Sequence, residues 1–484
     1  MDLFYTAFDW IRVNIPGWVY ITLVVHGTVL GAVAYLILLE RKVASWAQDR
    51  IGPNRVGLGF GLPFMPKFLQ NVNGLGQPLA DGLKFIVKED YCPGNVDKVL
   101  FTLAPGMMIL AVIISIAVLP WGGVIRTTRT VTVQHPENAA HYVPVTSTLV
   151  SGPTDIAEGQ GGRVVSITYQ WPFQIAQLNI GVLFVLATLS LSVYGVVIGG
   201  WASNNKYSFL GGLRATANMI SYEIPLGLAV LCLVLMFGTL DLGDIVEKQC
   251  HNWLWGIVPA WNVFTQPLAF TMFLICIHAE ANRAPFDLAE AEQELVGGYH
   301  TEYSSMRFAL FFLAEYAGMI TTSALCVALF FGGWDFPWFG LFRGPDPLHP
   351  AVTGSLILCL IRCGFFFAKT VGIIFVFMWV RWSLPRFRFD QLMMMAWRAL
   401  IPISLGLLLM TAAIVYFFNG DSYLQNADNF GVSLPMELCL LGANLVTLAA
   451  IVVISTMLPA APLTNRRVIV ANSRFNPKLA LSAK

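Results

Sequence analysis

Glutamate residues interrupt four of the long apolar runs in this sequence, at Glu40, Glu223, Glu280 and Glu315. An acid at the centre of a bilayer costs about 2.5–3.5 kcal/mol on insertion scales, so such a residue is a candidate for function. At 1.5 Å per helical residue, all four lie within roughly 10 Å of the same predicted membrane boundary. We therefore expect one layer of carboxyl groups that could store or relay protons. Glu40 ends its run and could instead extend to the surface.

A charged segment, residues 283–307, separates two of these runs. Its charged residues include Arg283, Asp287, Glu290, Glu292, Glu294 and Glu302. If its first part is helical, Asp287, Glu290 and Glu294 share one face. Arg283 then lies one turn before Asp287, a favourable spacing for pairing. Acids this close titrate as a coupled group, as a proton store requires. Glu292 and Glu302 could equally face water at the membrane surface.

Two cations lie inside a single apolar run. Arg362 and Lys369 are seven residues apart and are therefore expected on one helix face. We expect the acids above to supply their partners, either in an orienting ion pair or in a proton relay. His278, two residues before Glu280, could carry protons or could simply be hydrogen-bonded within the bundle.

The sequence gives little support for a bound redox centre. Its eight cysteines are scattered and form no CxxC pair. A metal ion or iron–sulfur cluster needs converging ligands at suitable spacing, so no metal site is expected. There is also no P-loop and no dinucleotide-binding glycine turn after a strand. Any electron transfer is therefore expected to depend on partner proteins.

The elements that carry these groups are predicted to be membrane-spanning helices. Hydrophobic residues make up 56% of the chain and charged residues 12%, about half the charge of a soluble domain. Runs of about 20 apolar residues, enough to span a bilayer, occur at 17–39, 99–119, 179–200, 218–237, 262–281, 308–331, 353–380, 400–418 and 437–458. We expect an all-α polytopic membrane protein with about nine transmembrane helices, because such runs must satisfy their own backbone hydrogen bonds. Lys and Arg concentrate in alternate loops, which places the N-terminus outside and the C-terminus in the cytoplasm.

These spans divide the chain into four regions. They are residues 1–120, with two helices, a cytoplasmic loop and an amphipathic helix; 121–173, a long outer segment; 174–418, the remaining bundle with the acidic segment; and 419–484, a last helix and a basic tail. In the outer segment, TVTVQ at 130–134 and VVSITYQW at 164–171 alternate apolar with polar residues, which predicts a small β-hairpin. Glycines at 159, 161 and 162 indicate its turn.

Five stretches of the sequence resemble one family. They are ERKVASWAQDRIGPNRVG (40–57), QPLADGLKFIVKED (77–90), GVVIGGWASNNKYSFLGGLRATANMISYEIPLGL (195–228), AEANRAPFDLAEAEQELVGGYHTEYSSMRFALFFLAEYAGM (279–319) and LPRFRFDQLMMMAWR (384–398). In this order they resemble the inner loops and flanking helices of the quinone-site membrane subunit of respiratory complex I, the proton-translocating NADH:quinone oxidoreductase. In that family this subunit, called H or 1, forms part of the quinone chamber and the start of the proton path.

The resemblance implies roles for particular residues. Glu223, Glu280 and Glu315 match the intramembrane glutamates of the family, and Asp287, Glu290, Glu292 and Glu294 match its acidic loop. The residues that match the surroundings of the quinone passage are Arg41, Gln48, Arg50, Arg283 and Phe312. The resemblance further implies quinone as substrate, with FMN and iron–sulfur clusters in partner subunits. The expected partners are hydrophilic quinone-site and iron–sulfur subunits, small and antiporter-like membrane subunits and the lipid bilayer, but not nucleic acid.

Some features depart from the family pattern and leave alternatives open. The outer segment 121–173 is an insertion, the loops near 253–261 and 334–350 are enlarged, and the ninth helix exceeds the common eight. This length is typical of bacterial members, so we expect a multi-pass protein of the bacterial inner membrane, catalytic only as a subunit. The alternatives are a membrane subunit of a related energy-converting hydrogenase or other reduced-carrier dehydrogenase, a stand-alone proton-coupled permease, and a passive membrane anchor.

Overall fold

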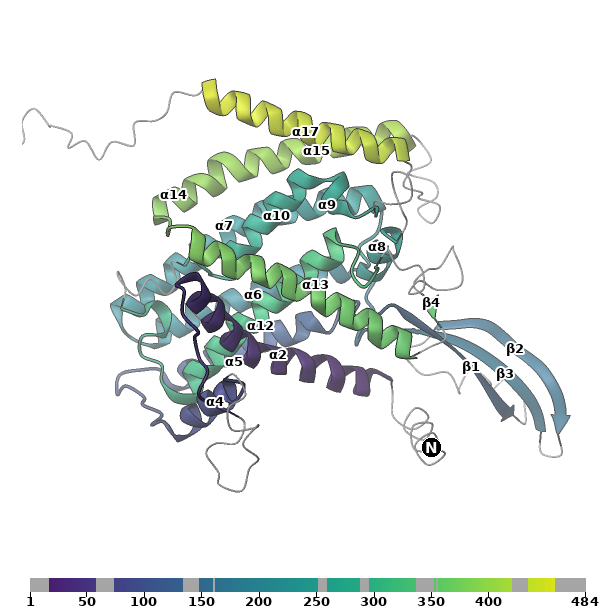
Figure 1. Ribbon diagram of the computed structural model, residues 1–484, viewed down its shortest axis with the longest axis horizontal. Coiled ribbons are helices and arrows are strands. Elements are labelled where there is room, and N and C mark those ends of the chain that lie inside the picture. Colours follow the sequence, from purple (N-terminus) through teal and green to yellow (C-terminus); the bar gives the residue numbers. More distant parts are fainter. Residues whose placement is uncertain are drawn as a thin grey trace, which may run out of the picture.

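The computed structural model describes residues 17–57, 74–133, 148–159, 162–250, 259–287, 296–336, 352–353, 356–419 and 434–457. Most of them form one bundle of helices, from which a curved β-sheet projects at one end (Figure 1). The longer helices are α2 (Gly17–Ala47), α5 (Lys98–Ile116), α6 (Gly181–Ala202), α7 (Lys206–Phe237), α10 (Pro267–Glu280), α12 (Ser305–Phe330), α13 (Leu356–Ser383), α15 (Ile401–Asn419) and α17 (Leu434–Met457). Shorter elements are α4 (Gln77–Val87), α8 (Leu242–Lys248), α9 (Asn262–Thr265), the 3₁₀ turn η3 (Gly298–His300), α14 (Phe389–Met394) and the π-helical turn η5 (Met395–Leu400).

The predicted multi-pass helical fold is confirmed. Within the described part of the chain, seven helical stretches are long and apolar enough to cross a membrane: α5, α6, α7, α12, α13, the continuous run through α14, η5 and α15, and α17. The other two predicted spans correspond to α2, with 31 residues, and to the shorter apolar helix α10, with 14 residues.

Two helix boundaries differ from those expected, for local reasons. Helix α7 begins at Lys206 rather than near 218, because the Asn205 side chain caps it by accepting a hydrogen bond from the Tyr207 amide. The run at 262–281 is broken into α9 and α10, because Gln266 adopts φ −132° and ψ 62°. Pro267, which has no backbone N–H to leave unpaired, then starts α10.

A glycine allows the closest approach between α5 and α6. A Cβ atom at Gly195 would lie 2.9 Å from the carbonyl oxygen of Ala104 and 2.9 Å from the Met108 Cβ. A side chain at this position would therefore push the two helices apart.

The outer segment forms a larger sheet than the predicted hairpin. Strands β1 (Val124–Val133), β2 (Thr148–Gly159), β3 (Gly162–Pro172) and β4 (Val352–Thr353) are arranged in the order β2-β3-β1-β4. The two predicted strand segments do pair, as antiparallel β1 and β3. The glycine-rich turn, however, joins β3 to β2, a strand the sequence pattern did not predict. Strand β4 pairs with β1 in parallel, so a segment that directly precedes α13 returns to this sheet.

Candidate functional site

Glu40, near the end of α2, is a buried carboxylate with partners from three other parts of the chain. It is 7% exposed, so it does not extend to the surface. The Tyr316 hydroxyl on α12 and the Arg381 guanidinium on α13 both donate to it. Arg283 Nη1 lies 3.5 Å from Glu40 Oε1, and its guanidinium lies 4.1 Å from the Tyr316 ring centroid. Two cations and a hydroxyl thus offset the cost of burying this charge.

A cavity of about 490 Å³ opens beside Glu40; we call it the arginine cavity. It is lined by Ile37, Glu40, Arg41, Ala44, Ser45, Gln48, Arg50, Pro53, Arg283, Phe312, Tyr316, Arg381 and Trp382. All five residues proposed from the sequence to contact quinone are therefore brought together around one space. Ligand pockets in proteins typically measure ~300–1,000 Å³ and combine apolar walls with a few polar groups, as this cavity does.

The loop after α2 forms one side of the arginine cavity, and short-range contacts fix it. The Arg50 amide donates to the Ser45 carbonyl at 2.8 Å, and the Arg50 side chain bonds to Gln48. Gly52 has φ +76°, and a Cβ there would lie 2.9 Å from Ser45 Oγ, so a larger residue would not fit this turn. Arg41 pairs with Asp81 of α4 at 2.9 Å, a half-exposed contact that adds little stability.

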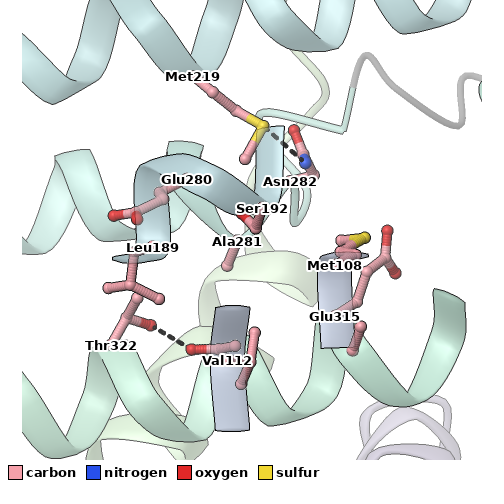
Figure 2. Close-up of a pocket in the computed structure, with 12 residues that line it drawn as sticks. Met108, Val112, Leu189, Ser192, Met219, Glu280, Ala281, Asn282, Glu315 and Thr322 are labelled. Carbon is pink, nitrogen blue, oxygen red and sulfur yellow. Dashed lines mark hydrogen bonds between the residues drawn. The ribbon is translucent and has the colours of Figure 1, made fainter. Parts of the chain in front are cut away.

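A second, smaller cavity lies deeper in the bundle; we call it the acid cavity. Its volume is about 30 Å³, and its lining includes Glu280 and Glu315. Figure 2 shows these two residues on opposite sides of the cavity, with Ser192 and Ala281 between them. A space of this size holds about two water molecules at ~10–15 Å³ each.

The acid cavity contains polar groups that suit bound water. Glu315 Oε1 accepts a hydrogen bond from the Tyr299 hydroxyl at 3.0 Å. Asn282, 5% exposed, donates to the Met219 sulfur at 3.6 Å (Figure 2). Its Oδ1 atom has no hydrogen-bond partner among the described residues. Buried polar atoms of this kind are commonly satisfied by water.

Helix α12 connects the two cavities. Tyr316 bonds to Glu40 in the arginine cavity, whereas the preceding residue, Glu315, lines the acid cavity. Glu223 on α7 acts electrostatically on Glu280, which places the fourth acid near the same group. The four acids predicted to share one level thus form a series from Glu40 through α12 to Glu280 and Glu223.

The Tyr299 hydroxyl is held in place by a close backbone contact. Gly298 has φ +62°, and a Cβ on Gly211 of α7 would lie only 2.8 Å from the Gly298 Cα. The ring of Tyr299 packs edge-on against Phe311 of α12, with centroids 5.2 Å apart. These contacts position the hydroxyl that bonds to Glu315.

The start of the acidic segment differs from the helix expected there. Residues 281–287 form successive turns, so the helical spacing that suggested an Arg283–Asp287 pair does not apply. Arg283 reaches Glu40 instead, and Asp287, 5% exposed, pairs with Arg386 at 3.1 Å. The Phe387 amide also donates to the Pro285 carbonyl at 3.2 Å. Glu290, Glu292 and Glu294 lie outside the described residues.

The expectation that the acid cluster partners Arg362 and Lys369 is wrong. Lys369 Nζ donates to the backbone carbonyls of Phe331, Gly333 and Asp335 at 2.6–2.9 Å. The Asp335 charge acts on both cations, and the Arg362 guanidinium lies 4.4 Å from the Trp334 ring centroid. These cations therefore brace the segment after α12, away from both cavities.

His278 adopts the structural alternative left open by the sequence. Its Nδ1 lies 2.7 Å from the Leu274 carbonyl, and its ring stacks on Phe377 with centroids 3.8 Å apart. Among the described residues, no group of three or more His, Cys, Asp or Glu side chains could hold a metal ion.

Sequence reasoning missed four residues of the site: Tyr299, Tyr316, Arg381 and Asn282. Two signals could have found some of them. Tyr316 directly follows an intramembrane glutamate, and Arg381 ends a long apolar run. Nothing in the local sequence distinguishes Tyr299 or Asn282.

The fold and the buried charges define a multi-pass membrane protein with a ligand-sized cavity joined to a series of intramembrane acids. The chain matches the family model described as NADH dehydrogenase over residues 20–412. It is 42% identical over 384 residues to the first H subunit of the NADH-quinone oxidoreductase of Cytophaga hutchinsonii, covering 79% of this chain and 92% of that protein. It is 43% identical over 390 residues to the H subunit of the same enzyme from Leptospira biflexa, covering 80% and 91%. With the first H subunit from Solibacter usitatus it shares 40% identity over 434 residues, covering 81% and 95%. The chain belongs to the NADH dehydrogenase family.

Proposed function

We propose that this chain is the H-type membrane subunit of an NADH-quinone oxidoreductase, in which it binds quinone and starts the coupling of quinone reduction to proton movement. The names of its relatives support the assignment to this complex. The residue roles rest on the two cavities.

The arginine cavity is the proposed quinone site. Phe312 and Trp382 supply apolar contacts for a ring or its tail, while Arg41, Arg50 and Arg283 line the same space with cationic groups. Cations stabilise negative charge that develops on quinone oxygens during reduction. The chain itself supplies position and charge, and the electrons come from flavin and iron–sulfur clusters in partner subunits.

Quinone reduction consumes two electrons and two protons and yields quinol. Removing protons and adding charge beside Glu40 changes the balance of its contacts with Arg283, Arg381 and Tyr316. Because interacting acids titrate together, that change alters the proton affinity of the neighbouring carboxyl groups. Protons then redistribute through the acid cavity between Glu315, Glu280 and Glu223.

One observation carries this proposal: consecutive residues of α12 face the two cavities. Tyr316 bonds to the acid beside the proposed quinone site, and Glu315 lines the hydratable acid cavity. A change of charge at Glu40 therefore reaches Glu315 through a single, largely buried helix.

The test uses the variants Glu315→Gln and Glu223→Gln in the assembled complex in sealed vesicles. Each removes an ionisable proton but keeps side-chain volume, so assembly and NADH oxidation by artificial acceptors should persist while quinone-coupled proton pumping is lost. Glu302→Gln is the matched control, because Glu302 accepts a hydrogen bond from Asn205 at 2.6 Å and does not line the acid cavity. Normal pumping in both test variants would remove these acids from the mechanism.

The setting follows from the same proposal. The chain would lie in a bacterial inner membrane, with α4, the acidic segment and α14 at the cytoplasmic end and the β-sheet outside. Its partners would be the hydrophilic quinone-site and iron–sulfur subunits and the small and antiporter-like membrane subunits. Co-purification with NADH-oxidising subunits supports this assignment, whereas a nickel–iron subunit in the complex would favour a hydrogenase.

A further inference from the structure

Helix α17 lies at the edge of the bundle, beyond the end of the family match at residue 412. It packs on α15 and reaches α9 and α10 (Figure 1). Most of its side chains are exposed, but one stripe is buried: Met436, Glu437, Leu440 and Asn444, each at most 1% exposed. Polar residues buried inside membrane bundles generally serve a specific contact.

Asn444 makes such a contact with a different helix. Its Oδ1 atom accepts a hydrogen bond from the Leu268 amide at 3.2 Å, and its Nδ2 donates to the Leu440 carbonyl on its own helix at 2.8 Å. Leu268 is the second residue of α10, so its amide has no carbonyl within α10 to bond to. In a membrane, an unpaired amide of this kind costs several kcal/mol.

Helix α10 needs this external cap because of the break that precedes it. Gln266 occupies the N-cap position but makes no side-chain cap, and its Oε1 has no partner among the described residues. Glutamine is one methylene longer than the residues that normally cap a helix from within. At the opposite end, α10 finishes at Glu280, which lines the acid cavity.

We propose that Asn444 of α17 is the N-cap of α10 and thereby a positioning residue for Glu280. With 14 residues, α10 is short, and a change at its first turn moves the whole helix rather than being absorbed along it. Loss of the cap therefore displaces the Glu280 carboxyl relative to the acid cavity. The role in coupling rests on the proposed function, whereas the role as a cap does not.

The cap is tested by hydrogen exchange on the intact complex carrying Asn444→Leu, which keeps volume and removes the acceptor. Exchange at the start of α10 should accelerate about five- to tenfold, as expected for the loss of one capping hydrogen bond. Thr447→Val is the matched control, because the Thr447 hydroxyl bonds only to the Ala443 carbonyl of its own helix in the contacts described. Equal protection in the two variants would overturn the proposal.

A rescue variant separates capping from general damage to α17. Gln266→Asn places a standard capping side chain at the start of α10 itself. Added to Asn444→Leu, it should restore protection and assembly if the missing contact is a cap. Failure to restore either, with a normally assembled Gln266→Asn single variant, would contradict that role.

The positioning role is tested by the ratio of protons pumped to electrons transferred. Asn444→Leu should lower this ratio and shift the pH profile of pumping, and it should add nothing further in a Glu280→Gln background. An equal additional loss in that background would show that Asn444 does not act through Glu280. Full pumping by Glu280→Gln alone would instead refute the proposed function, while the exchange measurement still decides whether Asn444 caps α10.

Discussion

At the scale of single residues, the site depends on how a buried carboxylate is neutralised. Glu40 is held by Tyr316, Arg283 and Arg381, which come from segments more than 200 residues away in the sequence. A buried charge whose partner is removed is left with unfavourable desolvation. The partners of Glu40 should therefore contribute more than its own exposed neighbours on α2.

The variant Tyr316→Phe tests this point. It removes one hydrogen bond to a charged group, so the complex should lose about 1.5–3 kcal/mol of local stability. We expect a lower midpoint for thermal inactivation of quinone reduction, with transfer from NADH to artificial acceptors unchanged. Tyr35→Phe, at a 46% exposed position of α2, serves as the control and should have no effect. Equal midpoints in the two variants would show that the Tyr316–Glu40 contact contributes nothing.

Residue types and spacing predicted the members of the site better than their partners. The residues Arg41, Gln48, Arg50, Arg283 and Phe312 do meet at one cavity. Spacing within a helix gives a face, but it does not give the depth at which another helix crosses that face. Lys369 therefore appeared to need a carboxylate, whereas its partners are backbone carbonyls after α12, which carry no side-chain signal.

At the scale of elements, close backbone contacts decide how the helices that carry the acids are arranged. Gly195→Ala places a Cβ 2.9 Å from the Ala104 carbonyl, so it should separate α5 from α6 and destabilise the bundle by about 1–3 kcal/mol. Gly106→Ala, on the facing helix α5, meets nothing within 4 Å and should be neutral. Yield and thermal stability of the purified complex provide the measurement, and equal stability of the two variants would contradict this packing.

Apolar runs located the helices because a membrane span must satisfy its own backbone and be long enough to cross. The same reasoning missed β2, because TLVSGPTDIAEG contains Gly152 and Pro153 and does not alternate regularly. It also missed the break at Gln266, where an apolar run continues through a change in backbone angles.

At the scale of the whole molecule, the account requires the sheet and the arginine cavity to face opposite sides of the membrane. In a background carrying Cys92→Ser and Cys439→Ser, Tyr91→Cys and Asp244→Cys each introduce a thiol at an exposed position. A membrane-impermeant maleimide applied from outside should label Asp244→Cys, near α8, and spare Tyr91→Cys, near α4. The reverse pattern would invert the proposed orientation.

The central claim is that quinone reduction changes the protonation of the acids around α12. Infrared difference spectra of the intact complex, recorded as bound quinone is reduced, report this change directly through the carboxyl C=O stretch. We predict a carboxyl signal in the unmodified complex that is diminished in Glu315→Gln and in Glu280→Gln, with quinone still bound. An identical carboxyl signal in both variants would contradict the account.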